Sequence, residues 1–337
     1  MYASVTPSGV EIIESAFSKK IGLVVIDSWV VPEGPKIVSL LPSATEIVYA
    51  LGLGERLVGV THECDFPPSA REKPHLTAST LPHAANAGEI DRHVRASLHS
   101  GSSLYALDST LLESLAPDLI VTQELCEVCA VSYEIVARAA KRLRGDPRIV
   151  SLEPSSLDDV YANIETVGEL TGRSEAATDL VATLRARADR LAERVVGRPR
   201  PRALVLEWTD PPMSGGHWTP GLIELAGGEA LLANPGANSQ VIAWDAIVAA
   251  DPDIIIVAPC GFGMPATLVA IDEMAASVPA WATLRAVVGH RVYAIDGNAY
   301  VNRPGPRLVD TAELFASALF DDRYGAALDD PTALVRV

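Results

Sequence analysis

The sequence predicts an α/β protein with two Rossmann-like lobes joined by a long rigid backbone helix. Two observations favour this fold class. Apolar strand patterns alternate with helical patterns in each half of the chain, as in parallel sheets covered by helices. The two halves also share one unit, a short helix followed by Pro-Asp and an apolar strand, at 111–122 and 246–257. We expect an N-terminal extension at 1–35, lobes at 36–155 and 200–337, and the linking helix at 156–199.

In the first lobe, strands and helices alternate from residue 36 onward. Ser43 and Glu46 are three residues apart directly after an apolar run, which predicts a capping box at the start of a helix. Residues 68–88 show no periodicity and are predicted to form a surface loop. We expect strands at 36–41, 56–61, 119–122 and 148–152, and helices at 43–51, 90–100 and 111–115.

A long helical pattern separates the two lobes. Its apolar positions run from Val160 to Val195 and continue across Thr171 and Gly172, so we expect one helix over 157–196. In the second lobe, Pro265 removes a helix donor from a loop that formally matches a dinucleotide fingerprint, and we exclude that motif. We expect strands at 202–208, 254–257 and 291–295, and helices at 220–226, 244–250 and 308–319.

Composition excludes several classes of function. The chain has 337 residues with 43 acidic and 27 basic side chains, a net charge of −16. Nucleic acid is excluded as the main partner because phosphate binding needs a basic surface. No apolar run reaches the ~18–20 residues that span a bilayer, so no membrane insertion is expected. The sequence has no Walker A motif and no Gly-x-Ser-x-Gly motif, so we do not expect an enzyme. We expect a monomer that binds a small molecule.

Side chains that could bind a ligand follow the ends of the predicted strands. Ligands of parallel sheets lie at the carboxyl ends of the strands, so loops from both lobes would face one cleft. Arg303 and Arg307 are donors suited to an anionic or amide-rich group. The candidate ligand-binding residues are His62, Glu63, Cys64, Trp208, His217, Trp218, Phe262, Tyr300, Arg303 and Arg307.

The four cysteines also follow predicted strands. They are Cys64, Cys126, Cys129 and Cys260. Thiolates bind soft metals, and Cys-x-x-Cys after a strand fits half of a zinc site or a redox pair. The alternative is that each thiol is a small buried apolar group. A second hypothesis is therefore that the cleft binds zinc or an iron–sulfur cluster, or contains a redox site, in a reducing cytoplasm.

The order of motifs resembles a known family. Ile37–Gly52 followed by Leu57–Thr61 resembles the opening of the periplasmic binding proteins that deliver cobalamin, haem and iron siderophores to ABC importers. The loops at 62–67, 126–129, 216–218, 260–262 and 298–306 are similar to the cobalamin-binding branch of this helical-backbone class. The resemblance covers 36–320 and implies two α/β lobes, a rigid helix and a shallow cleft between the lobes.

The same resemblance implies a ligand. Cobalamin, or a related tetrapyrrole, would lie against the aromatic faces of Trp208, Trp218, Phe262 and Tyr300. Arg303 and Arg307 would donate hydrogen bonds to its peripheral amides. Haem or an iron siderophore is the alternative that the family allows.

Two departures from the family pattern bear on location. Lys19-Lys20 precede an apolar stretch that Asp27 ends after six residues, and no small-x-small cleavage site follows. The positions that the resemblance assigns to permease-docking glutamates are Thr110 and Asp245. We therefore expect a cytoplasmic protein that stores, chaperones or senses its ligand. A periplasmic or extracellular protein is the alternative, and the partnership with an ABC permease is left open.

Overall fold

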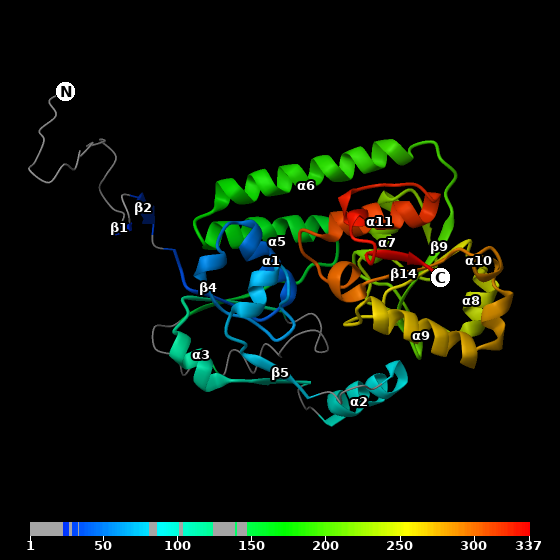
Figure 1. Ribbon diagram of the computed structural model, residues 1–337, viewed down its shortest axis with the longest axis horizontal. Coiled ribbons are helices and arrows are strands. Elements are labelled where there is room, and N and C mark those ends of the chain that lie inside the picture. The colour runs from blue at the N-terminus through cyan, green and yellow to red at the C-terminus, as the bar shows by residue number, and fades with distance from the viewer. Residues whose placement is uncertain are drawn as a thin grey trace, which may run out of the picture. The chain divides into compact units, whose positions relative to one another are not determined.

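The computed structural model describes residues 34–80, 86–100, 104–123, 139 and 147–337, and the backbone of two strands before them. The chain divides into two units, Met1–Pro35 and Lys36–Val337. In the first unit, β1 (Leu23–Ile26) pairs antiparallel with β2 (Trp29–Pro32). The described part of the second unit contains two large sheets, a separate two-stranded sheet and the helices around them (Figure 1).

The first sheet of the second unit has four parallel strands in the order β4-β3-β7-β8. Every residue of the central strands β3 and β7 is buried, as in parallel sheets that are covered on both faces. The strands are β3 (Ile37–Ser39), β4 (Leu57–Gly59), β7 (Leu119–Thr122) and β8 (Arg148–Ser151), with the helices α1 (Pro42–Ala50) and α3 (Ser109–Leu115) in this lobe.

A separate strand pair belongs to the same lobe. β5 (Thr77–Ser79) pairs antiparallel with β6 (Tyr105–Leu107), and α2 (Ala87–Ser100) lies between them in the chain. The prediction of a plain loop at 68–88 is therefore wrong, since this segment also contains a short 3-10 helix at Pro68–Glu72. Strands of three residues are too short for an alternating pattern to be visible in the sequence.

The second sheet has seven strands of mixed direction around β9 (Arg202–Thr209). β9, β13 (Ile254–Val257) and β14 (Val292–Ile295) are parallel neighbours in the order β12-β10-β9-β13-β14-β15, and β11 also pairs with β9. The other strands are β10 (Pro212–Ser214), β11 (Glu229–Ala230), β12 (Gln240–Val241) and β15 (Leu334–Arg336). The helices are α7 (Thr219–Leu225), α8 (Trp244–Ala250), α9 (Met264–Ser277), α10 (Arg285–Val288) and α11 (Leu308–Phe320).

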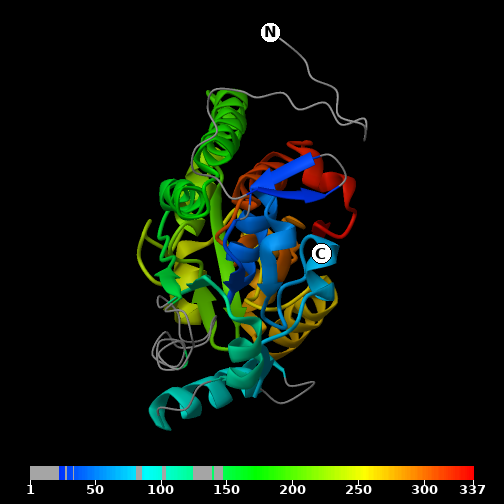
Figure 2. The same cartoon turned by 90° about the vertical axis from the view of Figure 1, so that its left-hand side faces the viewer.

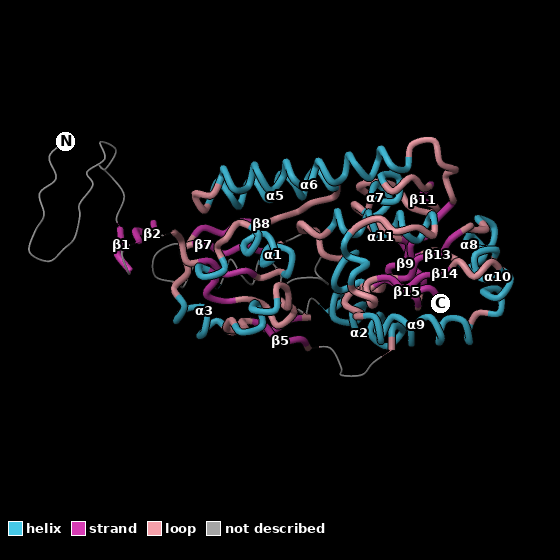
Figure 3. Tube along the Cα trace, turned by 45° about the horizontal axis from the view of Figure 1, so that its top comes forward, coloured by secondary structure: helices cyan, strands magenta, loops and turns pink. Residues whose placement is uncertain are grey.

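The two large sheets of the second unit are separate rather than one continuous sheet (Figure 3). This arrangement confirms the predicted α/β class with two lobes. Within the described ranges, no helix is both long and apolar enough to cross a membrane.

The linking segment consists of two helices, so the prediction of one helix over 157–196 is wrong. α5 (Leu157–Leu170) and α6 (Ser174–Val195) are separated by a turn in which Gly172 has a φ of +71°. Glycine adopts this left-handed conformation without steric cost, and the chain reverses there. The two helices pack side by side (Figures 1 and 2). Each helix has its own apolar stripe with a period near 3.6, so periodicity does not reveal the turn.

The longer of these helices connects the lobes by packing. α6 contacts α5 and also α7 and α11 of the second lobe, and α5 contacts α1 of the first lobe. One cluster of buried apolar residues includes Ile47 of the first lobe, Leu184 and Leu191 of α6, and Phe315 of the second lobe. This cluster therefore extends through both lobes and their connection, and each lobe has a further apolar cluster of its own.

Pro265 does not prevent a helix, which corrects the reasoning from the sequence. It lies in the first turn of α9 after Gly263, where a backbone N–H has no partner inside the helix and proline is tolerated. The capping box predicted at Ser43 and Glu46 is also wrong. The N-cap of α1 is Leu41, which makes no side-chain cap hydrogen bond, and Pro42 opens the helix.

Candidate functional site

The loop after β4 holds a neutral histidine. Residues 60–67 leave the carboxyl end of β4, where ligand-binding loops of parallel sheets lie. The Nδ1 of half-buried His62 is 2.7 Å from Thr77 Oγ1 in β5, and its ring centroid is 5.6 Å from that of Tyr105 in β6. Burial, together with nearby His75, lowers the pKa of His62, so the imidazole is uncharged at neutral pH.

Glu63 is the first residue of this loop to contact the second lobe. Its backbone carbonyl accepts a hydrogen bond from Arg303 Nη2 at 3.1 Å, and its carboxylate accepts one from Tyr105 Oη at 3.4 Å. Burial raises the pKa of Glu63, although the Arg303 charge opposes the shift. The loop and Arg303 are 240 residues apart in the sequence, and this contact joins the two lobes.

Arg303 is a buried cation with several partners from both lobes. It follows β14, and its side chain is only 4% exposed. It donates to Asp65 Oδ1 of the first lobe at 2.5 Å and to Asn298 Oδ1 of its own lobe at 3.0 Å. Its Nε is buried and has no partner within the described part of the chain. Most of the donors predicted to contact a ligand are therefore occupied by protein acceptors.

Arg307 makes the second cationic contact between the lobes. Its Nε and Nη2 donate to the two carboxylate oxygens of Glu46 at 2.9 Å and 2.5 Å, a bidentate geometry that gives strong, directional pairing. Its guanidinium lies 4.0 Å from the ring centroid of Phe66 and 5.5 Å from that of Tyr300. We call Glu46, Asp65, Arg303 and Arg307 the interlobe ion cluster.

Two aromatic residues meet where strands of the second sheet end. The rings of Trp208 and Phe262 pack edge to face with centroids 5.2 Å apart, after β13 and near the end of β9. The indole N–H donates to the Asp210 carbonyl at 3.0 Å. The backbone N–H of Asn298 donates to the Phe262 carbonyl at 3.2 Å. Asn298 therefore connects the aromatic pair to Arg303 and, through it, to the His62 loop.

Glu207 holds two loops together by hydrogen bonds beside the Trp208–Phe262 pair. Its carboxylate accepts hydrogen bonds from Thr219 Oγ1 at 2.8 Å and from Ser239 Oγ at 2.5 Å, with a longer one from the Gly216 amide at 3.4 Å. These donors are all neutral, and burial raises the pKa of Glu207. Sequence reasoning missed this residue because its partners come from two other segments, 216–219 and the loop with Ser239.

His217 and Trp218 lie in one of these loops. The two rings stack with centroids 5.5 Å apart, and His217 has a φ of +48°. Trp218 is buried in the core, and its indole N–H donates to the Val301 carbonyl at 2.8 Å. Trp218 therefore supports the loop that contains Tyr300. The Nε2 of His217 is buried without a partner among the described residues.

The cysteines are not brought together as a metal site. Cys64 is 1% exposed and lies 3.1 Å from Thr45 Oγ1 and 3.2 Å from Thr61 Oγ1. Burial raises the pKa of its thiol, which disfavours the thiolate that a metal needs. Cys260 is partly exposed at the end of β13. Cys126 and Cys129 lie outside the described residues.

The described residues therefore do not support the binding of zinc or of an iron–sulfur cluster. Within it, no group of three or more His, Cys, Asp and Glu side chains is arranged to hold a metal ion. The structure thus corrects the expectation that Cys64 would be a metal ligand, since Cys64 packs as a core residue.

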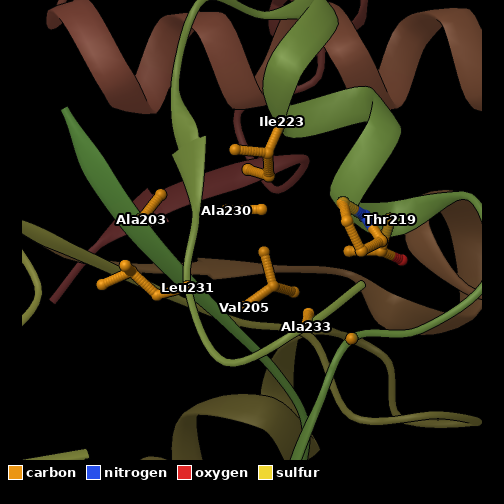
Figure 4. Close-up of a pocket in the computed structure, with 9 residues that line it drawn as sticks. Ala203, Val205, Thr219, Ile223, Ala230, Leu231 and Ala233 are labelled. Carbon is orange, nitrogen blue, oxygen red and sulfur yellow. The ribbon is translucent and has the colours of Figure 1, made fainter. Parts of the chain in front are cut away.

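Two hollows are present near these loops. A cavity of about 10 Å³ inside the second lobe is lined mostly by apolar residues such as Val205 and Ile223 and is too small for an organic ligand (Figure 4). A hollow of about 250 Å³ lies between the lobes, beside the interlobe ion cluster. It is lined by Glu46, Tyr49, Ala50, Phe66, Pro67, Pro306 and Arg307.

The two positions that the resemblance assigns to permease docking are both exposed. Thr110 lies at the start of α3 and Asp245 lies in the first turn of α8. The shared Pro-Asp units therefore place them at equivalent points of the two lobes.

The chain resembles substrate-binding proteins along most of its length. It is 28% identical over 303 residues to the uncharacterized ABC transporter substrate-binding lipoprotein YvrC of Bacillus subtilis, which covers 87% of this chain and 82% of the relative. It is 25% identical over 292 residues to the vitamin B12-binding protein of Vibrio cholerae, which covers 82% of this chain and 86% of the relative.

Solved structures share the fold. The periplasmic vitamin B12-binding protein BtuF of Vibrio cholerae matches 85% of this chain and 96% of its own, with a TM-score of 0.61 and 23% identity. A periplasmic heme-binding protein from Pseudomonas aeruginosa matches 86% and 94%, with a TM-score of 0.66 and 19% identity. At these identities the likeness supports the fold alone.

The family match overturns the expectation of a cytoplasmic protein. A family model described as periplasmic binding protein matches residues 37–299. The Bacillus subtilis relative is a substrate-binding lipoprotein, and the BtuF structure is that of a periplasmic protein. The expectation rested on residues 19–27 and on Thr110 and Asp245, and these local features do not outweigh a match over most of the chain.

Proposed function

The chain belongs to the periplasmic binding protein family, and from this premise we propose that it binds cobalamin or a related tetrapyrrole between its lobes. It is a substrate-binding protein of the ABC-transporter type. Such proteins bind a small solute and pass it to a permease, so we assign no catalytic residue. Delivery of the bound ligand to an ABC permease is part of the proposal.

The observation that carries the proposal is the line of contacts across the lobe boundary. Arg303 donates to the Glu63 carbonyl and to Asn298, and Asn298 donates to the carbonyl of Phe262, whose ring packs on Trp208. Polar groups of one lobe are thereby held close to aromatic groups of the other. A flat macrocycle with polar edges needs this combination of apolar faces and a few fixed polar groups.

The proposed ligand contacts follow from these positions. The faces of Trp208, Phe262 and Tyr300 would contact the macrocycle, and His62, Glu63 and His217 would contact its polar or metal-bearing parts. Arg303 and Arg307 would support the loops through the interlobe ion cluster. The names of the vitamin B12-binding relatives support cobalamin as the first ligand to test.

The test is calorimetric titration of the full chain with cyanocobalamin. We expect saturable binding of one molecule per chain with a dissociation constant below ~1 μM, about −8.2 kcal/mol. The absence of heat and of any spectral change at ~100 μM ligand would overturn cobalamin binding.

A pair of tryptophan variants separates site effects from fold effects. Trp208→Ala removes an aromatic face at the end of β9, and we expect at least tenfold weaker binding, about 1.4 kcal/mol. Trp244→Ala is the control, because Trp244 packs edge-on against Trp281 at 6.2 Å in the α8 region. Equal affinities for the two variants, both folded, would remove Trp208 from the site.

Haem is the second candidate, because a heme-binding protein shares this fold. Haemin added to the cyanocobalamin complex distinguishes the two. Displacement of cobalamin by an equimolar amount of haemin would favour haem as the ligand, whereas retention of cobalamin would favour the first proposal.

A further inference from the structure

His62 has the local geometry of a metal ligand held in place by a second residue. Thr77 Oγ1 accepts a hydrogen bond from the His62 backbone N–H at 3.1 Å and lies 2.7 Å from its Nδ1. In the tautomer that carries its proton on Nδ1, this N–H donates to the Thr77 hydroxyl oxygen. That tautomer leaves a lone pair on Nε2, and metal-binding histidines use the same arrangement.

The remaining ring nitrogen is available. Across the described residues, Nε2 of His62 makes no hydrogen bond, and it is not one of the buried unpartnered atoms. The tilted ring of Tyr105 restricts the imidazole from one side. A fixed, uncharged imidazole with one free nitrogen needs little reorganisation to bind a metal.

We propose that His62 Nε2 is an axial ligand to the metal at the centre of the bound tetrapyrrole. This inference rests on the proposed function and adds the atom that recognises the metal. His62 directly precedes Glu63 in the sequence, and the Glu63 carbonyl accepts a hydrogen bond from Arg303 of the other lobe. His62 is thus one residue from the lobe boundary, and hydrogen bonds through Arg303 and Asn298 connect that boundary to the Trp208–Phe262 pair.

The step is a ligand exchange without oxidation or reduction. In aquocobalamin, the bond from cobalt(III) to its axial water breaks and a bond to His62 Nε2 forms. The lone pair comes from the imidazole, the water molecule leaves to solvent, and no proton is transferred. Cyanocobalamin has cyanide at this position, which imidazole does not displace, so it binds without the exchange.

Visible spectroscopy of the full chain tests the inference. We expect aquocobalamin to show, on binding, the band shift that free imidazole produces, and cyanocobalamin to bind without it. His62→Ala is expected to bind aquocobalamin without the shift and to recover it when free imidazole is added. His75→Ala is the matched control, because His75 is exposed nearby and is expected to leave the shift unchanged.

A second measurement does not depend on any variant. Cob(II)inamide lacks the nucleotide base of cobalamin, so any nitrogen coupling in its electron paramagnetic resonance spectrum comes from the protein. Protein labelled with ¹⁵N-histidine is expected to convert that coupling from three lines to two. No nitrogen coupling, or a shift that persists in His62→Ala, would overturn the inference while cobalamin binding itself stands. Failure of the wild-type chain to bind any of these corrinoids would instead overturn the proposed function and, with it, this inference.

Discussion

Glu46 is a buried acid whose environment depends on a residue far along the chain. Its side chain is 2% exposed and pairs with Arg307, which is 261 residues away in the sequence. A buried ion pair is costly to form, but removal of one partner leaves an uncompensated charge in the protein interior. The contact therefore makes correct placement of the two lobes a condition for stability.

Glu46→Gln tests this contact directly. The variant leaves the Arg307 cation without its carboxylate, and we expect a loss of about 3–5 kcal/mol in the free energy of unfolding. Asp329→Asn is the matched control, since Asp329 pairs with Arg323 on the surface with both side chains more than half exposed, and a loss of at most ~1 kcal/mol is expected there. Urea unfolding of both variants measures the difference, and similar losses would contradict a special role for Glu46.

The raised pKa of Glu207 predicts that this residue makes the folded protein less stable as the pH rises. Acidic side chains with a lowered pKa have the opposite effect. Burial raises the folded pKa of Glu207 above the ordinary value of 4.5. The folded state therefore binds this proton more tightly than the unfolded state does. The resulting contribution to stability is complete below about pH 4.5 and is lost as the pH rises through the raised folded pKa.

We expect Glu207→Gln to remove this loss. Between pH 4.5 and pH 8 the melting temperature of the wild type should fall relative to that of the variant, because the variant cannot ionise at this position. Differential scanning calorimetry across the range measures the difference. Parallel pH profiles for the two proteins would show that the Glu207 pKa is the same in the folded and unfolded states.

At the scale of elements, much of the fold was predictable because each strand or helix has a local signature. The buried strands β7 and β13 are apolar runs after Pro-Asp, and the structure contains both. The interlobe ion cluster was not predictable in the same way. Ser43 and Glu46 have the spacing of a capping box, and only the folded arrangement shows that Glu46 binds Arg307 instead.

The turn between α5 and α6 was missed for a related reason. Two helices with similar apolar stripes give the same periodicity as one helix, and the only local sign was Gly172 beside Thr171. Glu207 gave no sign at all, since a single acid in a strand has no pattern and its partners Thr219 and Ser239 come from other segments. Residues whose role depends on distant partners need the structure.

Gly216 provides an element-level prediction about the loop that Glu207 fastens. A Cβ atom there would lie 2.2 Å from Ser239 N and 2.7 Å from Ala237 O, which are backbone atoms that cannot move aside alone. We expect Gly216→Ala to cost about 1–3 kcal/mol and to weaken ligand binding by displacing this loop.

Gly221→Ala in α7 is the matched control for Gly216→Ala. A Cβ atom at Gly221 would have no neighbour within 4 Å, so alanine is expected to stabilise the helix by up to ~1 kcal/mol. Thermal unfolding and cyanocobalamin titration of both variants check the pair. A Gly216→Ala protein with wild-type stability and affinity would show that the two loops are free to separate.

At the scale of the second unit, several contacts hold the lobes together. The linking helices form one of them, because α5 contacts α1 of the first lobe while α6 contacts α7 and α11 of the second, and α2 also contacts β9. The interlobe ion cluster joins the loop after β4 to the segment after β14. Contacts at separate points restrict movement of one lobe against the other.

This arrangement predicts a binding protein that changes little when its ligand arrives. We expect the radius of gyration from X-ray scattering to be the same with and without cyanocobalamin for the wild type. Arg303→Ala removes the side chain that contacts Asp65 and the Glu63 carbonyl, so faster amide exchange is expected at 62–67 and at 297–303 but not in β13. Arg285→Ala is the control, because that arginine is 60% exposed and its ion-pair partners Asp251 and Asp253 lie in its own lobe. If Arg303→Ala leaves exchange at both loops unchanged, the other contacts between the lobes fix them without the cluster. If it speeds exchange everywhere, the cluster stabilises the whole fold rather than the lobe boundary.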